Sequence, residues 1–197
     1  MIIVEGPDGS GKSVLVEKLK RKLNIQEVIQ WNNPPRNSDE LALNLRESWL
    51  LTRQCVIQDR ITWITEPIYD LAKKSTECKG LSWHQYIDAN RAMKPVTLIY
   101  CRPPNEVIRE HAITGNSPPD TDLYLEWIAS NCDEIIALYD IFMNLIEPTL
   151  KYDWTKPRDE MALDILVNDI KRSPIYLRSI QNLSEYQQNH RGNSPSN

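Results

Sequence analysis

The sequence has few of the residues that build disulfide frameworks and zinc sites. Its 197 residues include four cysteines and three histidines. The cysteines are widely spaced and form no CxxC pair, which is typical of buried or free thiols in a reducing compartment. No histidine accompanies a pair of cysteines, so the pattern argues against a zinc site. The four cysteines are Cys55, Cys78, Cys101 and Cys132.

Long hydrophobic runs are also absent. No stretch of about 18 apolar residues occurs, so no segment is expected to span a membrane. The chain starts directly with MIIVEG, without the basic stretch and cleavage site of a secretion signal. We therefore expect a cytoplasmic protein with no membrane partner. With 41% apolar and 25% charged residues, the chain has the composition of one globular domain with a full core.

Basic residues are missing from one long segment. Between residues 111 and 150 there is no lysine or arginine, whereas seven Asp and Glu residues fall there. Binding to a nucleic-acid backbone requires many cations, so the net charge of −4 argues against a general nucleic-acid binder. The last 27 residues carry four basic residues against one acid, which leaves a local basic path open.

Short apolar runs alternate with helical patterns along the chain. This alternation, with strands that are apolar throughout, predicts an α/β three-layer sandwich around a five-stranded parallel sheet. Strands are expected at 1–5, 27–31, 55–59, 96–101 and 150–154. Helices are expected at 12–23, 38–54, 82–93, 105–111, 124–146 and 159–170, with Ser38 as the N-cap of the second. The polar tail from about residue 184 is expected to be mobile or loosely docked.

Residues 6–13, GPDGSGKS, form a segment that we call the phosphate loop. They match the phosphate-binding pattern GxxxxGK[ST] at every position. A predicted strand precedes the match and a predicted helix follows it. The glycines let backbone N–H groups converge on an anion, and the N-terminal end of the helix adds a positive dipole. Lys12 can reach the β- and γ-phosphates of a nucleoside triphosphate, and the hydroxyl of Ser13 can bind Mg2+. The residues expected to bind ATP here are Gly6, Asp8, Gly9, Ser10, Gly11, Lys12, Ser13 and Val14.

A second motif, CVIQDR, spans residues 55–60. Its apolar residues predict a strand that ends in Asp59, and ligands of parallel α/β sheets bind beyond the carboxyl ends of the strands. Asp59 is therefore expected beside Ser13, where it can hold Mg2+ or accept a proton. Arg60 comes next and can clamp a phosphate, because a guanidinium matches phosphate geometry.

Together, EGPDGSGKS at the first strand and QDR at the third resemble the thymidylate kinase branch of the P-loop nucleotide kinases. That branch has EGxDGxGK[ST] and DR[YH] at the matching places. The resemblance is closer to phage-encoded thymidylate kinase-like proteins, which have stretches like ITWITEPIY after the DR pair and like LIYCRPP at the fourth strand. It covers roughly residues 1–160, densely in the motifs and thinly between them.

The resemblance implies a P-loop kinase fold with strand order 2-3-1-4-5, ATP on the phosphate loop and the acceptor between strands 1 and 3. The kinase domain would span 1–183, with a lid at about 109–124, and a polar tail would span 184–197. Asp8 would lie near the acceptor's sugar, Arg60 would contact the acceptor's phosphate, and Lys156 and Pro157 would lie near adenine. If the protein is encoded by a phage, it would work in the cytoplasm of the host cell. Relatives of this kind are often homodimers.

The sequence departs from the family in two places. Arg36 stands roughly where the family has an arginine near the acceptor, but the surrounding residues differ. The loop at 113–122 has two acids and no basic residue, although nucleotide kinases usually close arginines over the phosphates there. Charge in the transition state would then be neutralised by Arg102 and Arg109, and Arg91 is a further candidate near the acceptor.

The aromatic residues comprise six tryptophans and eight tyrosines but a single phenylalanine. This bias favours rings with polar partners or rings that stack on a ligand. Trp31, Trp63 and Tyr69 fall near the expected acceptor cleft, where they either sandwich a base or pack in the core. Glu66 either binds an acceptor hydroxyl or base edge, or caps a helix.

These residues leave four functions open. The first is an ATP- and Mg2+-dependent deoxynucleoside monophosphate kinase, in which Arg60 and Arg36 hold the acceptor's phosphate. The second is a kinase that phosphorylates hydroxymethyluracil in DNA for hypermodification, with Asp59 or Asp8 as general base and the target base flipped out. The third is a deoxynucleoside kinase, although that branch carries Arg-Ser after the acid of the third strand, where this sequence has DRI. The fourth is a nucleotide-binding module without chemistry.

Overall fold

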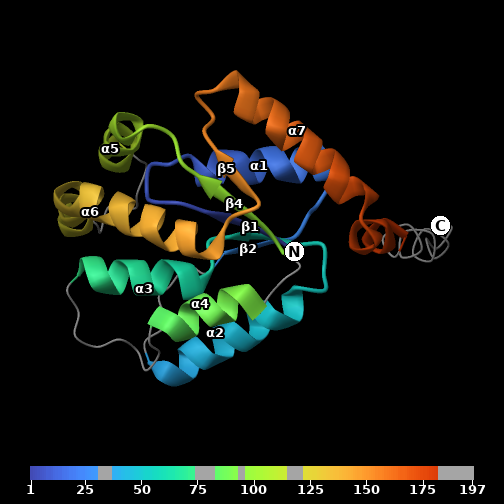
Figure 1. Cartoon of the computed structure of the whole chain (residues 1–197), viewed down its shortest axis with the longest axis horizontal. Coiled ribbons are helices and arrows are strands. Elements are labelled where there is room, and N and C mark those ends of the chain that lie inside the picture. The colour runs from blue at the N-terminus through green and yellow to red at the C-terminus, as the bar shows by residue number, and fades with distance from the viewer. Residues whose placement is uncertain (31–36, 74–82, 93–95, 115–121, 182–197) are drawn as a thin grey trace, which may run out of the picture.

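The computed structural model describes residues 1–30, 37–73, 83–92, 96–114 and 122–181. Five parallel strands form one sheet in the order β2-β3-β1-β4-β5. The strands are β1 (Ile2–Glu5), β2 (Val28–Gln30), β3 (Ile57–Asp59), β4 (Thr97–Cys101) and β5 (Leu150–Tyr152). Figure 1 shows helices on both faces of this sheet, so the predicted three-layer sandwich and strand order are confirmed.

The helices form two separate cores with the sheet. Ile2 and Val4 of β1 pack with α1 and α7, whereas Ile3, between them, packs in the core of the opposite face with α2, α3, α4 and α6. This alternation is what a strand buried on both faces requires. The helices are α1 (Lys12–Leu23), α2 (Ser38–Leu51), α3 (Thr62–Ala72), α4 (Trp83–Ala92), α5 (Asn105–Thr114), α6 (Asp122–Ile146) and α7 (Pro157–Arg172). A further helical stretch covers 174–181.

The strand register brings several loops to one edge of the sheet. Val4 of β1 pairs with Asp59 of β3 and with Ile99 of β4. Tyr152 of β5 pairs with Cys101 at the end of β4. Because parallel strands end at a common edge, the loops after β1, β3, β4 and β5 meet there. This carboxyl edge is the place for the functional site.

Helix α3 is the element that the sequence patterns missed. No helix is predicted between residues 54 and 82, yet α3 occupies Thr62–Ala72. Pro67 lies inside it, and an internal proline normally ends or kinks a helix because it lacks the N–H group. Most of α3 is buried, including Trp63, Ile64 and Ile68. Tertiary packing therefore outweighs the local preference.

The start of α2 differs from the prediction by one residue. The side chain of Asn37 caps the helix by accepting hydrogen bonds from the N–H groups of Asp39 and Glu40 at 3.1 and 2.9 Å. Ser38 is instead the first helical residue. Both residue types cap helices well, so sequence alone does not decide between neighbours of this kind.

Two predictions about the whole chain have different outcomes. Within the described ranges, no helix has both the length and the apolar character needed to cross a bilayer. The polar tail at 184–197 lies outside the described residues, so the domain boundary at residue 183 stays a prediction.

Candidate active site

The loop between β1 and α1 is enclosed by two distant segments. Gly11 is the N-cap of α1 with a φ of 88°, which favours glycine, and a Cβ atom there would lie 2.7 Å from Nε1 of Trp154. Gly9 has a φ of 79°, and a Cβ atom there would lie 2.4 Å from the carbonyl oxygen of Ile108 in α5. Both positions therefore need glycine for backbone conformation and for close approach.

Lys12 is the first residue of α1 and is only 6% exposed. Its Nζ atom donates a hydrogen bond to the carbonyl oxygen of Pro7 at 2.7 Å, so the ammonium group lies over the loop. Burial, together with the positive charge of Arg60, lowers the pKa of Lys12 to about 8. A bound phosphate would favour the charged form of this ammonium group. Ser13 follows on the first helical turn and is exposed, as a Mg2+ ligand has to be.

Three side chains converge on the carboxylate of Asp8. The guanidinium of Arg60 forms an ion pair with Oδ1, and the hydroxyls of Tyr69 and Tyr124 donate to Oδ2 at 2.8 and 3.1 Å. Burial alone would raise the pKa of Asp8, but the charges of Arg60 and Lys12 hold it well below its usual range. Asp8 is therefore anionic near neutral pH and a poor proton acceptor.

The backbone of Arg60 is strained. Its φ is 70°, in the left-handed region that residues with a side chain rarely adopt, and its N–H donates to the carbonyl oxygen of Val4 at 3.0 Å. Its guanidinium lies 5.8 Å from the centroid of the Tyr69 ring. Such a conformation costs about 1–2 kcal/mol and is concentrated at functional sites. The structure thus brings Asp8 and Arg60 together between β1 and β3, where the acceptor is predicted to bind.

Sequence reasoning missed Glu5, which lies fully buried at the end of β1. Its carboxylate accepts hydrogen bonds from the N–H groups of Ile61 and Gly6 and from the hydroxyls of Thr65 and Tyr139. Despite these donors, burial raises the pKa of Glu5 from 4.5 to about 7. The signal in the sequence was an acid at the end of an otherwise apolar strand.

The raised pKa of Glu5 predicts a pH-dependent loss of stability. Between pH 4.5 and about 7, the folded protein keeps a proton on Glu5 that the unfolded chain has already released. The free energy of unfolding should therefore fall by about 3 kcal/mol across this interval because of this residue. We expect the variant Glu5→Gln to lose this fall, as measured by urea unfolding at a series of pH values.

The matched control for this prediction is Glu17→Gln, which changes an exposed glutamate of α1. Its stability should follow the wild-type pH profile. Parallel profiles for the wild type and Glu5→Gln would show that Glu5 does not cause the pH dependence.

Asp59 ends β3 at the same edge as the phosphate loop. Its Oδ2 accepts a hydrogen bond from Nε2 of Gln30 at 3.1 Å. In the part of the chain that the structure describes, no group of three or more His, Cys, Asp or Glu side chains could hold a metal alone. The binding of Mg2+ by Ser13 and Asp59, with nucleotide phosphates and water as its other ligands, stays a prediction.

Two arginines predicted to neutralise charge are paired with acids of α6. The guanidinium of Arg102 binds both carboxylate oxygens of Asp140, at 2.9 Å through Nε and 2.8 Å through Nη2. Arg109 of α5 pairs with Asp133 at 2.7 Å in a solvent-exposed contact. The hydroxyl of Tyr100 also donates to Asp140 at 2.9 Å. These contacts connect α6 to β4 and α5, and a role of either arginine in phosphate transfer stays a prediction.

The aromatic and acidic residues predicted for the acceptor side differ in exposure. Tyr69 reaches the site through its bond to Asp8. Trp63 is 2% exposed and packs in the core, and Glu66 is buried on α3. Tyr124, for which no role was predicted, is instead the exposed ring beside Asp8.

The remaining acceptor residues are not tested by this geometry. Arg91 is exposed in the last turn of α4. Trp31, Arg36 and most of the lid, residues 115–121, lie outside the described residues. Their roles stay predictions.

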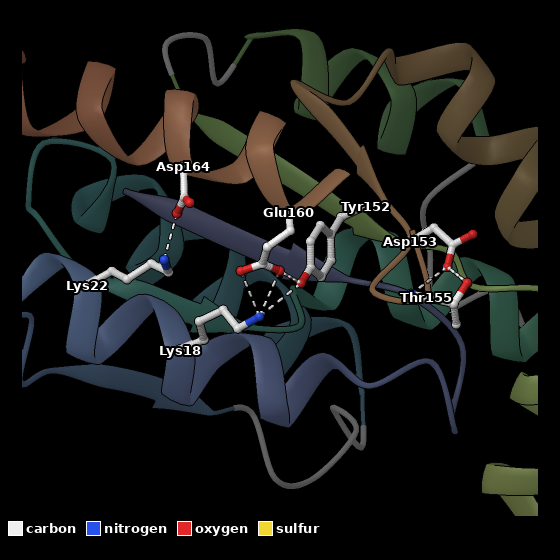
Figure 2. Close-up of polar contacts among 7 residues, drawn as sticks. All are labelled: Lys18, Lys22, Tyr152, Asp153, Thr155, Glu160 and Asp164. Carbon is white, nitrogen blue, oxygen red and sulfur yellow. Dashed lines mark hydrogen bonds and ion pairs between the residues drawn. The ribbon is translucent and has the colours of Figure 1, made fainter. Parts of the chain in front are cut away.

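The loop between β5 and α7 is bonded internally and anchored on the phosphate loop. Figure 2 shows Oδ1 of Asp153 accepting hydrogen bonds from the N–H and the hydroxyl of Thr155, at 3.1 and 2.7 Å. The ammonium of Lys156 pairs with Oδ2 of the same carboxylate at 2.8 Å. Trp154 donates from Nε1 to the carbonyl oxygen of Ser10 at 3.0 Å. A tryptophan that was assigned to the strand therefore joins this loop to the phosphate loop, and the predicted position of Lys156 and Pro157 near adenine stays a prediction.

Ion pairs hold α7, and with it this loop, against α1. Lys18 contacts both carboxylate oxygens of Glu160, and the hydroxyl of Tyr152 donates to the same carboxylate at 2.7 Å (Figure 2). One turn further along α7, Asp164 pairs with Lys22 at 2.6 Å. The position of the β5–α7 loop is thus fixed relative to the helix that starts at the phosphate loop.

The comparisons with known proteins give matches among solved structures. No protein-family model matches it, and no curated protein does. The YorR protein of Bacillus subtilis, in complex with phosphorylated GDP, has a TM-score of 0.61 at 24% identity, over 86% of this chain and 95% of that one. Deoxyadenosine kinase from M. mycoides, with the products dCMP and a flexible dCDP, has a TM-score of 0.51 at 16% identity, over 86% and 97%. With the strand order and the phosphate loop, these likenesses show that the chain has the P-loop kinase fold.

Proposed function

We propose that this chain uses ATP and Mg2+ to phosphorylate a deoxynucleoside monophosphate of the thymidylate type. The observation that carries the proposal is the strained Arg60 beside the phosphate loop. A guanidinium has five N–H donors, and the hydrogen bond to Asp8 uses the Nη2 group. The other donors can hold an acceptor phosphate beside the γ-phosphate of ATP.

The charges at the site fit a phosphate acceptor better than a hydroxyl acceptor. An oxygen of the acceptor's phosphate attacks the γ-phosphorus, the bond to the β–γ bridging oxygen breaks, and ADP leaves. The acceptor oxygen is already ionised, so no general base is required. Asp8 has a depressed pKa and three bonded partners, and it suits the binding of Arg60 rather than proton transfer.

The donor side follows from the phosphate loop. Its backbone N–H groups and Lys12 hold the β- and γ-phosphates. Ser13 and Asp59 would hold Mg2+, which would supply positive charge to offset that of the phosphates. Lys12 already lies over the loop, bonded to the carbonyl oxygen of Pro7. On binding of the triphosphate, this ammonium group would exchange its bond to Pro7 for one to a phosphate oxygen.

A hydroxyl-acceptor kinase, acting on a deoxynucleoside or on hydroxymethyluracil in DNA, is the second candidate. One observation favours it: the pKa of Glu5, about 7, is that of a general base. Its carboxylate is fully buried and is bonded to four donors, so a hydroxyl of the acceptor could reach it only by displacing one of them. We therefore rank this candidate below the monophosphate kinase.

The test offers the protein γ-labelled ATP and Mg2+ with three acceptors in turn: deoxynucleoside monophosphates, deoxynucleosides, and DNA containing hydroxymethyluracil. We expect label on a pyrimidine deoxynucleoside monophosphate. Label only on DNA or only on nucleosides would overturn the proposed acceptor. ATP binding without label on any acceptor would instead support a nucleotide-binding module without chemistry.

A further inference from the structure

The phosphate loop has two different flanks. Asp8 and Arg60 lie on the flank toward β3 and α3. Gly9 and Gly11 lie on the other, against α5 and Trp154. During transfer, the γ-phosphate faces the acceptor on the first flank. The nucleoside part of the donor must therefore extend toward the second flank.

The second flank carries an aromatic surface. The indole of Trp154 is 39% exposed while its Nε1 binds the carbonyl oxygen of Ser10 at 3.0 Å. The imidazole of His111, also exposed, stacks on this indole with centroids 5.7 Å apart and planes inclined by 24°. Two flat rings that are partly open to solvent thus adjoin the place where the triphosphate binds. Such a surface suits a nucleobase.

Most hydrogen-bond donors of the β5–α7 loop beside this surface are already bonded within the loop. The N–H groups of Asp153, Thr155 and Lys156 donate to Asp159, to Asp153 and to the carbonyl oxygen of Asp153, respectively. The hydroxyl of Thr155 and the ammonium of Lys156 are both bonded to the carboxylate of Asp153. These groups would have to break bonds to read the edge of a base. Strong discrimination between bases requires such donors and acceptors.

We infer that the donor site recognises the nucleobase by stacking on Trp154 and His111 without reading its hydrogen-bonding edge, so that ATP and GTP serve alike as phosphate donors. This inference deepens the proposed function and rests on its donor side. Stacking tolerates different bases because every base has a flat π-face. The larger purines cover more of the surface than the pyrimidines, so CTP and UTP should bind more weakly than ATP and GTP.

The test measures binding of ATP, GTP, CTP and tripolyphosphate by calorimetry, without any acceptor. We expect the dissociation constants of ATP and GTP to agree within about threefold. Trp154→Ala should weaken the binding of ATP and of GTP by about tenfold to a hundredfold. Trp154→Phe, which keeps a ring, should retain most of the affinity. Tripolyphosphate has no base, so its affinity should be the same in the wild type and Trp154→Ala. The matched control is Trp49→Ala, which removes an exposed tryptophan from α2 and should change nothing.

Two results would overturn the inference. A preference of more than about thirtyfold for one purine would show that the edge of the base is read. An equal loss of ATP and tripolyphosphate affinity in Trp154→Ala would show that the indole only supports the phosphate loop. The proposed function fails separately. If ATP and GTP bind alike but no acceptor is phosphorylated, the kinase assignment falls, whereas the recognition of the base by stacking on Trp154 still stands.

Discussion

Replacing Lys12 with alanine is expected to reduce phosphate transfer by about a thousandfold. The ammonium group lies over the phosphate loop in a buried position, where its charge acts on a developing negative charge with little screening by water. Transfer of a phosphate group depends almost entirely on positioning and on such charge stabilisation. The measurement is the initial rate of ADP formation with saturating ATP and acceptor.

The control for this prediction separates chemistry from folding. Lys12→Ala removes one hydrogen bond to the carbonyl oxygen of Pro7, which should cost about 1 kcal/mol of unfolding free energy and leave the protein folded. Lys20→Ala changes a lysine of the same helix that pairs with Glu17 at the surface, and it should keep wild-type activity. A folded Lys12→Ala variant with more than about a tenth of wild-type activity would show that transfer does not occur on this loop.

Most strands and helices of the fold were predictable because their determinants are local. Apolar strands that alternate with helices identify a parallel sheet, and Gly11, Lys12 and Ser13 identify a phosphate loop from spacing alone. The strand order came from the resemblance to thymidylate kinases, since no local pattern states which strands are neighbours. Helix α3 was missed for the opposite reason. Its internal Pro67 contradicts the local pattern, and only burial against the rest of the protein explains it.

The details of the site were less predictable because they depend on contacts between distant residues. Tyr124 and Asp8 are separated by 116 positions, and Trp154 and Ser10 by 144. Nothing near Tyr124 in the sequence indicates that its hydroxyl reaches the phosphate loop. Arg102 shows the reverse case. Its place at a strand end predicts a role toward a phosphate, which stays a prediction, and no local pattern indicates its bidentate pair with Asp140 of α6.

Replacing Arg60 with alanine is expected to lower kcat/KM for the monophosphate acceptor by about a thousandfold, with the affinity for ATP changed by less than about threefold. In the proposed function, the guanidinium beside Asp8 holds the acceptor's phosphate, whereas the phosphate loop and Lys12 hold ATP. Arg60→Lys keeps the charge but not the bidentate geometry. Its kcat/KM should therefore lie between those of the wild type and Arg60→Ala, about tenfold to a hundredfold below the wild type. Steady-state kinetics with the acceptor varied, and calorimetry with ATP, measure the two effects.

The strained backbone at Arg60 provides a control within the same residue. Its φ of 70° is unfavourable for alanine but not for glycine, so Arg60→Gly should be more stable than Arg60→Ala by about 1 kcal/mol. If the guanidinium acts on the acceptor, both variants lose the same activity despite this difference in stability. Arg172→Ala, which changes an exposed arginine of α7, should behave as the wild type. Recovery of activity in Arg60→Gly alone would show that Arg60 shapes the loop after β3 and does not bind the acceptor's phosphate.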